Sequence, residues 1–131
     1  MKKIIKSEDE WKALLTEEEF LITRKKNTEP AFSGKEFNII NKGSFVCKCC
    51  DANLFNHSSK YDSGCGWPSF FEQISPEAIK MKKDLSSGMI RTEIMCSSCD
   101  SHLGHIFDDG PNPTGQRYCV NSLSINYKES E

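Results

Sequence analysis

IRTEIMCSSC, residues 90–99, joins the pattern of a β-strand to a pair of cysteines separated by two residues. From Ile90 to Ile94 every second side chain is uncharged and those between are charged, which is the period of a half-buried strand. Cys96 and Cys99 then have the spacing at which one tight turn offers two thiolates to a single metal ion. The stretch predicts a strand that ends in one half of a metal site.

A second pair, Cys47 and Cys50, repeats this spacing nearer the N-terminus. Residues 51–95 separate the two pairs, and these 45 residues exceed the spacing of a compact zinc ribbon, so a shared ion would pin two distant hairpins together. Four thiolates leave no open coordination position, which is typical of structural zinc. The sequence therefore predicts one structural zinc per chain, bound by Cys47, Cys50, Cys96 and Cys99.

Two other interpretations of these cysteines stay open. The four thiols could line the core without a metal, or could bind an iron–sulfur cluster, which would colour the protein. Cys49 lies inside the first pair, where its adjacency to Cys50 suits a single ion poorly, and we expect it to be a bystander.

The rest of the chain predicts a helical N-terminal segment followed by a β core. Ser7 and Thr16 each precede a glutamate three positions later, the capping box of a helix start, and the helical segment covers about residues 7–26. From about residue 36 to residue 127 the periodicity changes to two. With no repeat and no linker, residues 1–131 are expected to form one domain, mainly antiparallel β.

The β core is expected to begin with a hairpin and to end with a long strand. The hairpin would pair residues 37–39 with residues 45–47 around a turn at 41–43. The last strand would run without a break from about residue 117 to residue 127. Glycine- and proline-rich loops lie between the other strands.

Composition excludes several classes of protein. With 17 basic and 19 acidic residues the net charge is −2, which gives no reason to expect a nucleic-acid or anionic-membrane partner. No apolar run approaches the length that spans a bilayer, and the one after the first lysines is too short for a signal peptide, so a cytoplasmic protein is expected. The odd count of seven cysteines argues against a purely structural disulfide framework and favours metal binding and redox catalysis.

Cys119 lies in RYCVNS, residues 117–122. Alternate residues share one face of a strand, so Arg117, Cys119 and Asn121 are expected to point the same way. A neighbouring cation favours the thiolate, which is the nucleophilic form of cysteine, and the Asn121 amide could orient a polar group of a substrate. A plain buried cysteine in a strand fits the local sequence equally well.

Cys65 lies in SGCGWP, residues 63–68, where flanking glycines allow unusual backbone angles and close approach. An accessible cysteine in such a loop suits a resolving thiol, although a loop cysteine without a partner fits as well. Trp67 next to Pro68 would form a rigid apolar wall, or else an ordinary core tryptophan.

His102 and His105 closely follow the second cysteine pair. Because four cysteines already saturate a zinc ion, the two imidazoles are free to act as proton donors near neutral pH. The alternative is a pair of structural histidines held by hydrogen bonds.

Taken in order, several segments resemble the type B methionine sulfoxide reductases. The resemblance covers about residues 8–127 and depends on the ordered set, since no single segment would suffice. The segments are CGWPSF at 65–70, RTE at 91–93, HLGHIF at 102–107, DGP at 109–111 and RYCVNS at 117–122, with TEP at 28–30 and FSG at 32–34 extending the match.

The resemblance implies an enzyme that reduces methionine-R-sulfoxide, protein-bound or free, to methionine. Cys119 would attack the sulfoxide sulfur and become a sulfenic acid. Cys65 would then form a disulfide with Cys119, and thioredoxin would reduce that disulfide. A cysteine at position 65 favours this simple two-cysteine cycle.

The resemblance also implies roles for the neighbouring side chains. His102 and His105 resemble histidines that bind and help to protonate the sulfoxide oxygen. Trp67 resembles a ring that packs on the methyl group of the substrate, and Arg117 and Asn121 match residues near the reacting sulfur. The implied fold is two antiparallel sheets with the N-terminal helices packed outside.

Two departures from the family pattern are visible, because Cys49 is an extra thiol and Ser87 stands where many members have histidine. A zinc-ribbon-like binding module is one competing function, but it would need a basic face and only Lys48 is basic within or next to the cysteine pairs. A redox switch that releases its metal is another, and it would leave Cys65 and Cys119 without a role. The sequence therefore favours a monomeric repair enzyme that acts on oxidised proteins with thioredoxin as its reductant.

Overall fold

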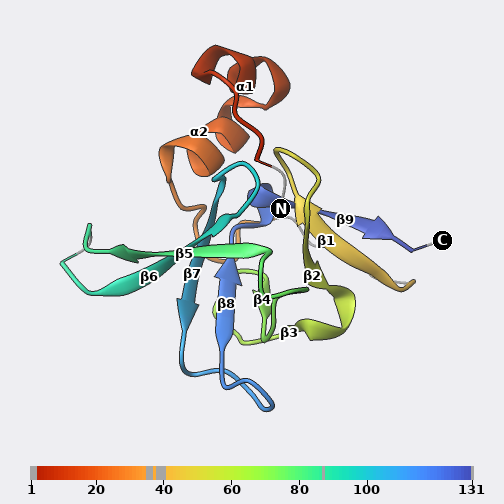
Figure 1. The fold of residues 1–131 in the computed structure, drawn as a ribbon. Coiled ribbons are helices and arrows are strands. Elements are labelled where there is room, and N and C mark those ends of the chain that lie inside the picture. Colours follow the sequence, from red (N-terminus) through yellow and green to blue (C-terminus); the bar gives the residue numbers. More distant parts are fainter. Residues whose placement is uncertain (1–2, 35–36, 38–40, 87, 131) are drawn as a thin grey trace.

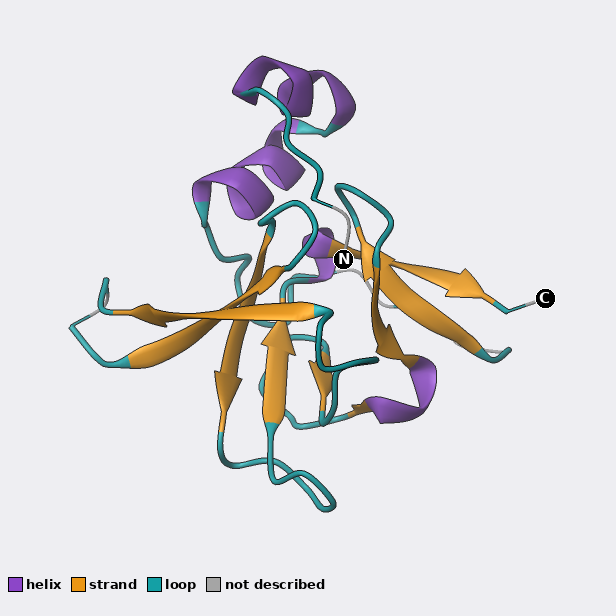
Figure 2. Cartoon of the chain, viewed as in Figure 1, coloured by secondary structure: helices purple, strands orange, loops and turns teal. Residues whose placement is uncertain are grey.

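The structure of this chain, a computed structural model, describes residues 3–34, 37, 41–86 and 88–130. Two antiparallel β-sheets lie beside two short helices (Figures 1 and 2). The elements are the helices α1 Glu8–Leu14 and α2 Glu17–Lys25, the 3₁₀ turns η1 His57–Ser59 and η2 Ser122–Ser124, and the strands β1 Gly43–Cys47, β2 Asn53–Asn56, β3 Lys60–Tyr61, β4 Ser69–Phe70, β5 Ile79–Asp84, β6 Arg91–Cys96, β7 His102–Phe107, β8 Arg117–Val120 and β9 Ile125–Glu129. The predicted fold class is confirmed.

The two sheets differ in size. The smaller has the strand order β2-β1-β9 and the larger the order β3-β4-β8-β7-β6-β5. Within the larger sheet β8 lies between β4 and β7, so its side chains meet residues from two distant parts of the chain. The hairpin of β5 and β6 extends away from the smaller sheet (Figure 1).

Both helices lie in the segment that the capping boxes predict. The Ser7 hydroxyl accepts a hydrogen bond from the Glu10 amide at 3.2 Å, and the Glu10 carboxylate accepts one from the Ser7 amide at 2.9 Å. Thr16 and Glu19 form the same reciprocal pair at the start of α2. Such bonds satisfy amides that the first turn of a helix leaves unpaired. Neither helix has the length and apolarity that crossing a bilayer requires, and the other described residues contain no such helix.

Three buried phenylalanines join the two sheets. Phe45 and Phe55 come from the smaller sheet and Phe70 from the larger, and none of the three is exposed to solvent. The rings of Phe55 and Phe70 stack at 4.1 Å, and Phe45 packs edge-on against Phe70 at 4.9 Å. The core therefore sits between the sheets, where aromatic pairs add to the free energy of burial.

The C-terminal run is not one strand, and the prediction of an unbroken strand is wrong. β8 ends, η2 makes one tight turn, and β9 continues in the other sheet. The Asn121 amide donates to the Leu103 carbonyl at 2.8 Å, and the Ser124 hydroxyl donates to the His102 carbonyl at 2.9 Å. These buried bonds replace the strand ladder at the break, which a period of two in the sequence does not reveal.

The predicted N-terminal hairpin is only partly covered, because residues 38–40 lie outside the described residues. Its second strand is present as β1, which pairs with β2 and β9. The strand predicted within residues 90–94 is present as β6, although Ile90 precedes its first residue and is exposed.

Candidate metal centre and thiol site

Four cysteines converge where β1 and β6 end. Cys47 is the last residue of β1 and Cys96 the last of β6. The Sγ atoms of Cys47 and Cys99 lie 3.6 Å apart, as do those of Cys50 and Cys96. All four sulfurs lie within 4.8 Å of one another, so the structure brings the two predicted cysteine pairs together.

The two cysteine turns are built alike. In each, a backbone amide four residues after the first cysteine donates to the carbonyl of that cysteine at 2.9 Å, from Asp51 to Cys47 and from Asp100 to Cys96. Both aspartates adopt positive φ angles, 63° and 61°, a left-handed conformation that aspartate tolerates better than most residues. The closing bond curls each turn so that both of its sulfurs face the other pair.

This cluster fits a tetrahedral metal ion. Zinc–sulfur bonds of about 2.3 Å place neighbouring sulfurs about 3.8 Å apart, close to the separations found here. Three of the four cysteines are buried and Cys50 is half-buried, which gives a closed site. Cys49 lies outside the cluster, and its sulfur contacts the Ser101 hydroxyl at 3.7 Å.

Cys65 and Cys119 form a second, separate pair of thiols. Cys119 lies on β8 and Cys65 in the loop between β3 and β4, and their Sγ atoms are 3.3 Å apart. Gly64 and Gly66, with φ angles of 77° and 92°, give this loop its shape. A disulfide bond is about 2.0 Å long, so a movement of about 1.3 Å would close it. The structure thus places the two cysteines predicted to react within reach of each other.

The two thiols differ in acidity. Burial, and after it the hydrogen bond with Cys65, raise the pKa of Cys119 to about 12. Burial also acts against the Cys65 thiolate, but hydrogen bonds with Ser63, Ser69, the Trp67 backbone and Cys119 together outweigh it and lower the pKa of Cys65 to about 7. The more acidic thiol is therefore Cys65, whereas the sequence favours a thiolate at Cys119.

Arg117 does not offset the burial of Cys119, because its charge is largely committed to another partner. Its guanidinium binds both carboxylate oxygens of Asp109, at 2.8 and 3.2 Å, which raises the pKa of Arg117. It also stacks on the Phe107 ring at 4.3 Å from the centroid. Arg117 still lowers the pKa of Cys119, but by less than burial and Cys65 raise it.

A cavity of about 270 Å³, here called the thiol cavity, is lined by both of these cysteines. Trp67 forms part of its wall, and the indole N–H donates to the Glu29 carbonyl at 2.9 Å, which fixes the ring. His105 and Arg117 also line it. The cavity therefore combines an apolar wall with a few polar groups near the sulfurs, the usual composition of a small-ligand site.

Asn121 lines the thiol cavity, but both ends of its amide are engaged elsewhere. The side chain is buried, its oxygen accepts from the Glu29 backbone amide at 3.1 Å, and its nitrogen donates to the Leu103 carbonyl at 3.1 Å. Asn121 thereby ties the segment that supports Trp67 to β7. This position suits a residue that holds the wall of the cavity.

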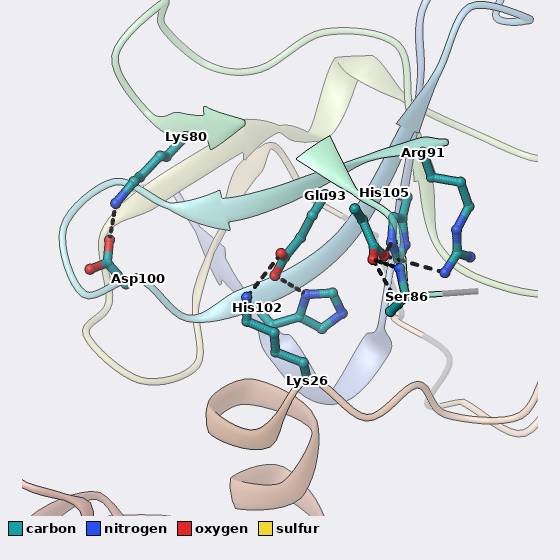
Figure 3. A network of polar contacts seen from close by, with 9 residues as sticks. Lys26, Lys80, Ser86, Arg91, Glu93, Asp100, His102 and His105 are labelled. Carbon is teal, nitrogen blue, oxygen red and sulfur yellow. Dashed lines mark hydrogen bonds and ion pairs between the residues drawn. The ribbon is translucent and has the colours of Figure 1, made fainter. Parts of the chain in front are cut away.

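His105 lies directly across from Cys119 in the pairing of β7 with β8. Its Nε2 atom is 2.7 Å from a carboxylate oxygen of Asp84, at the end of β5. Figure 3 shows His105 beside Ser86 and Arg91, which also donate to Asp84. Hydrogen bonds from Ser86 and then from His105 lower the pKa of Asp84, so this carboxylate stays ionised and holds the imidazole in place.

His102 lies beside His105, with ring centroids 5.7 Å apart, but does not line the thiol cavity. Its Nδ1 atom is 2.8 Å from one oxygen of Glu93, whose other oxygen accepts from Lys26 at 3.1 Å (Figure 3). Burial lowers the pKa of His102, and Glu93 opposes that shift. The buried Nε2 atom has no hydrogen-bond partner among the described residues.

Sequence reasoning missed both carboxylates, Asp84 and Glu93. The period of two places Glu93 on the polar face of β6, yet only 4% of it is exposed. Asp84 falls in a stretch that indicates a turn. Both strands carry other charged residues, so composition does not single out these two, and only the register of β5, β6 and β7 shows that each carboxylate reaches a histidine.

Comparisons with known proteins agree with this geometry. Residues 15–129 match the family model described as SelR domain. A protein named Peptide methionine sulfoxide reductase MsrB from Acinetobacter baylyi is 56% identical over all 131 residues, which cover 94% of that relative. Relatives of the same name from Acinetobacter baumannii and Hahella chejuensis are 53% and 51% identical over the same shares of the two chains.

A crystal structure of the Mis18 'Yippee-like' domain has a similar fold, with a TM-score of 0.55 at 12% identity. The match covers 70% of this chain and 99% of that domain, and it concerns the fold alone. The family follows from the closer relatives and from the SelR match, which spans most of the sequence. The chain therefore belongs to the SelR domain family, the type B methionine sulfoxide reductases.

Proposed function

We propose that this protein reduces methionine-R-sulfoxide, free or within oxidised proteins, to methionine, through Cys119 and Cys65. The observation that carries the proposal is the 3.3 Å separation of these two sulfurs in a cavity walled by Trp67 and His105. Membership of the family supports the reaction class, and the thiol pair supports the two-cysteine route.

In the first step, the Cys119 sulfur attacks the sulfoxide sulfur. The hydrogen bond between the thiols lets the proton of Cys119 pass to the Cys65 thiolate as the attack begins. A second proton reaches the sulfoxide oxygen. The hydroxyl group then moves from the substrate sulfur to Cys119, so that the sulfur–oxygen bond of the substrate and the new sulfur–sulfur bond both break and Cys119 becomes a sulfenic acid. Methionine leaves, reduced by two electrons, and Cys119 is oxidised by two electrons.

The neighbouring side chains position the substrate and supply the proton. His105 faces Cys119 and is oriented by Asp84, so it is the proposed proton donor, with His102 beside it. Trp67 offers the apolar surface for the methyl group. Asn121 and Arg117 are positioning residues in this scheme, since both are held by bonds to other parts of the cavity wall.

In the second step, Cys65 attacks the sulfenic acid of Cys119. The disulfide forms, and the hydroxyl group leaves as water with the proton of Cys65. A protein dithiol, proposed to be thioredoxin, then supplies two electrons and two protons that return both cysteines to thiols. The short distance between the sulfurs favours rapid closure, and the low pKa of Cys65 favours its role as the resolving thiolate.

The four-cysteine cluster is proposed to hold one structural zinc. Cys47, Cys50, Cys96 and Cys99 offer four soft thiolate ligands at separations that suit a tetrahedral ion. Bound there, zinc supplies no chemistry to the reaction but joins the ends of β1 and β6. We infer that the protein acts as a monomer and repairs oxidised proteins in the cytoplasm under oxidative stress.

The activity is tested with separated diastereomers of peptide methionine sulfoxide and dithiothreitol as reductant. We expect turnover of the R epimer alone, because an asymmetric cavity places only one configuration with its oxygen toward His105 and its methyl group toward Trp67. Methionine formation is measured by chromatography. No turnover, or equal turnover of both epimers, would contradict the proposal.

Cys65→Ser separates the two steps. The variant is expected to form about one methionine per chain in a single turnover, but to lose at least about 90% of its steady-state rate with thioredoxin, because the disulfide cannot form. Rapid-quench measurement of the first turnover and a thioredoxin-coupled assay distinguish the phases. A normal coupled rate in this variant would remove Cys65 from the resolving role.

A further inference from the structure

A second cavity, of about 550 Å³ and here called the basic cavity, adjoins the thiol cavity. The two share Thr28, Arg91 and His105 in their walls. Figure 3 shows part of the basic cavity, where Lys26 reaches from the end of α2 toward Glu93 on the larger sheet. Its cationic lining comes from α2, its C-cap and the β5–β6 hairpin, and consists of Lys25, Lys26, Lys82, Lys83 and Arg91.

Positive charge exceeds negative charge in this lining. Against the five cations stand two carboxylates, Asp84 and Glu93. Each carboxylate is already bound by one histidine and one cation. Lys82 lies opposite Glu93 in the pairing of β5 with β6, and it makes no ion pair within the described part of the chain. Lys25 is also paired, with Glu8 of α1, so the positive charge that remains without a partner in this cavity lies on Lys82 and Lys83 among the described residues.

His102 adds a buried polar atom without a partner. It is 3% exposed, it lines the basic cavity, and its Nε2 atom makes no hydrogen bond to the described residues. Because Glu93 binds the Nδ1 side, the neutral ring presents Nε2 as an acceptor. A buried polar atom left unpaired is unfavourable, so binding that brings a hydrogen-bond donor to this atom would be favoured.

We propose that the basic cavity receives an acidic side chain of the protein substrate, close in sequence to the methionine sulfoxide. This inference rests on the proposed function, which places the sulfoxide in the adjoining thiol cavity. An extended chain advances about 3.4 Å per residue, so a residue one or two positions from the methionine sulfoxide reaches across the shared wall. A free amino acid fits less well, because it is a zwitterion and brings no net negative charge to this space.

The test compares three peptides in which methionine-R-sulfoxide is flanked on both sides by glutamate, glutamine or lysine. With dithiothreitol, wild-type kcat/KM is expected to be about fivefold higher for the glutamate peptide than for the glutamine peptide. It is expected to be lowest for the lysine peptide. A fivefold effect is typical of partly exposed charge pairs. Lys82→Gln is expected to lower the glutamate-to-glutamine ratio below about two. Raising the ionic strength from about 0.02 M to about 0.3 M should also lower the wild-type glutamate-to-glutamine ratio, because salt screens the attraction between charges.

Lys128→Gln is the matched control, since it removes an equal charge from an exposed pair with Asp51 at the far edge of the smaller sheet. Its glutamate-to-glutamine ratio should equal that of the wild type. A wild-type ratio near one, or a ratio that Lys82→Gln leaves unchanged, would overturn the proposal, as would a preference for free methionine-R-sulfoxide over all three peptides. Failure to turn over even the glutamine peptide would instead refute the proposed function and this inference with it.

Discussion

Cys119→Ser is expected to lower kcat/KM for methionine-R-sulfoxide by at least about 10⁴-fold, because the hydroxyl of serine cannot replace the attacking sulfur. The substitution replaces one buried sulfur atom by oxygen and keeps nearly the same side-chain volume, so the fold should persist. Single-turnover methionine formation should be absent in this variant. Thermal unfolding followed by circular dichroism checks that the loss is one of chemistry.

Cys65→Ser is the matched control for this result, because it makes the same change on the other sulfur of the pair. The acidity of the two thiols predicts a different result, in which Cys65 is the attacking sulfur. The pKa of Cys65 lies near 7 and that of Cys119 near 12, so acidity alone would favour Cys65 as the nucleophile. The position of Cys119 opposite His105 favours Cys119. A first turnover that survives in Cys119→Ser and vanishes in Cys65→Ser would reverse the assignment.

Removal of the metal is expected to unfold the protein. A structural zinc site of four thiolates contributes about 10–16 kcal/mol, which is as large as the whole net stability of a small domain, about 5–15 kcal/mol. Cys96→Ser should therefore lower the melting temperature by more than about 20 °C or prevent soluble expression. Wild-type protein, denatured in the presence of a chelator, should release about one zinc per chain, measured by atomic absorption.

Cys49→Ser controls for the general effect of losing a thiol in this region. Its sulfur is not one of the four in the cluster, although it lies near Cys47 and Cys99 as well as Ser101, so the variant should keep its zinc and melt within about 5 °C of the wild type. Wild-type protein that contains no zinc, or a Cys96→Ser variant as stable as Cys49→Ser, would refute the four-cysteine site.

The parts of the site that depend on local spacing were predictable from the sequence. Two residues between cysteines define a tight turn by themselves, and two such turns with soft ligands are expected to share an ion. The turns at Cys47 and Cys96 follow this expectation closely. The capping boxes at Ser7 and Thr16 are predictable for the same reason, since every bond within them spans three residues.

The parts that depend on register were not predictable. Glu93 reaches His102, and Asp84 reaches His105, only because three strands align at particular positions that no short pattern encodes. The order of acidity of the two thiols also depends on tertiary structure, because burial raises the pKa of Cys119 while hydrogen bonds lower that of Cys65. The 3₁₀ turn after Asn121 escaped prediction because the serines within it, Ser122 and Ser124, alternate with Leu123 and Ile125 as they would in a strand.

Because the chain crosses from β8 to β9 within a few residues, the turn η2 is a short tether between the strand that carries Cys119 and the metal centre. Ile125 pairs with Cys47, and the Ser124 carbonyl accepts from the Lys48 amide at 2.9 Å, within the first cysteine turn. Damage that frees the ion would loosen this tether and shift Cys119 from its partners without altering Cys119 itself. If the cluster holds zinc and the protein has the proposed repair function, oxidants strong enough to attack the cluster would inactivate the enzyme that reverses their damage, and recovery would need both zinc and a thiol reductant.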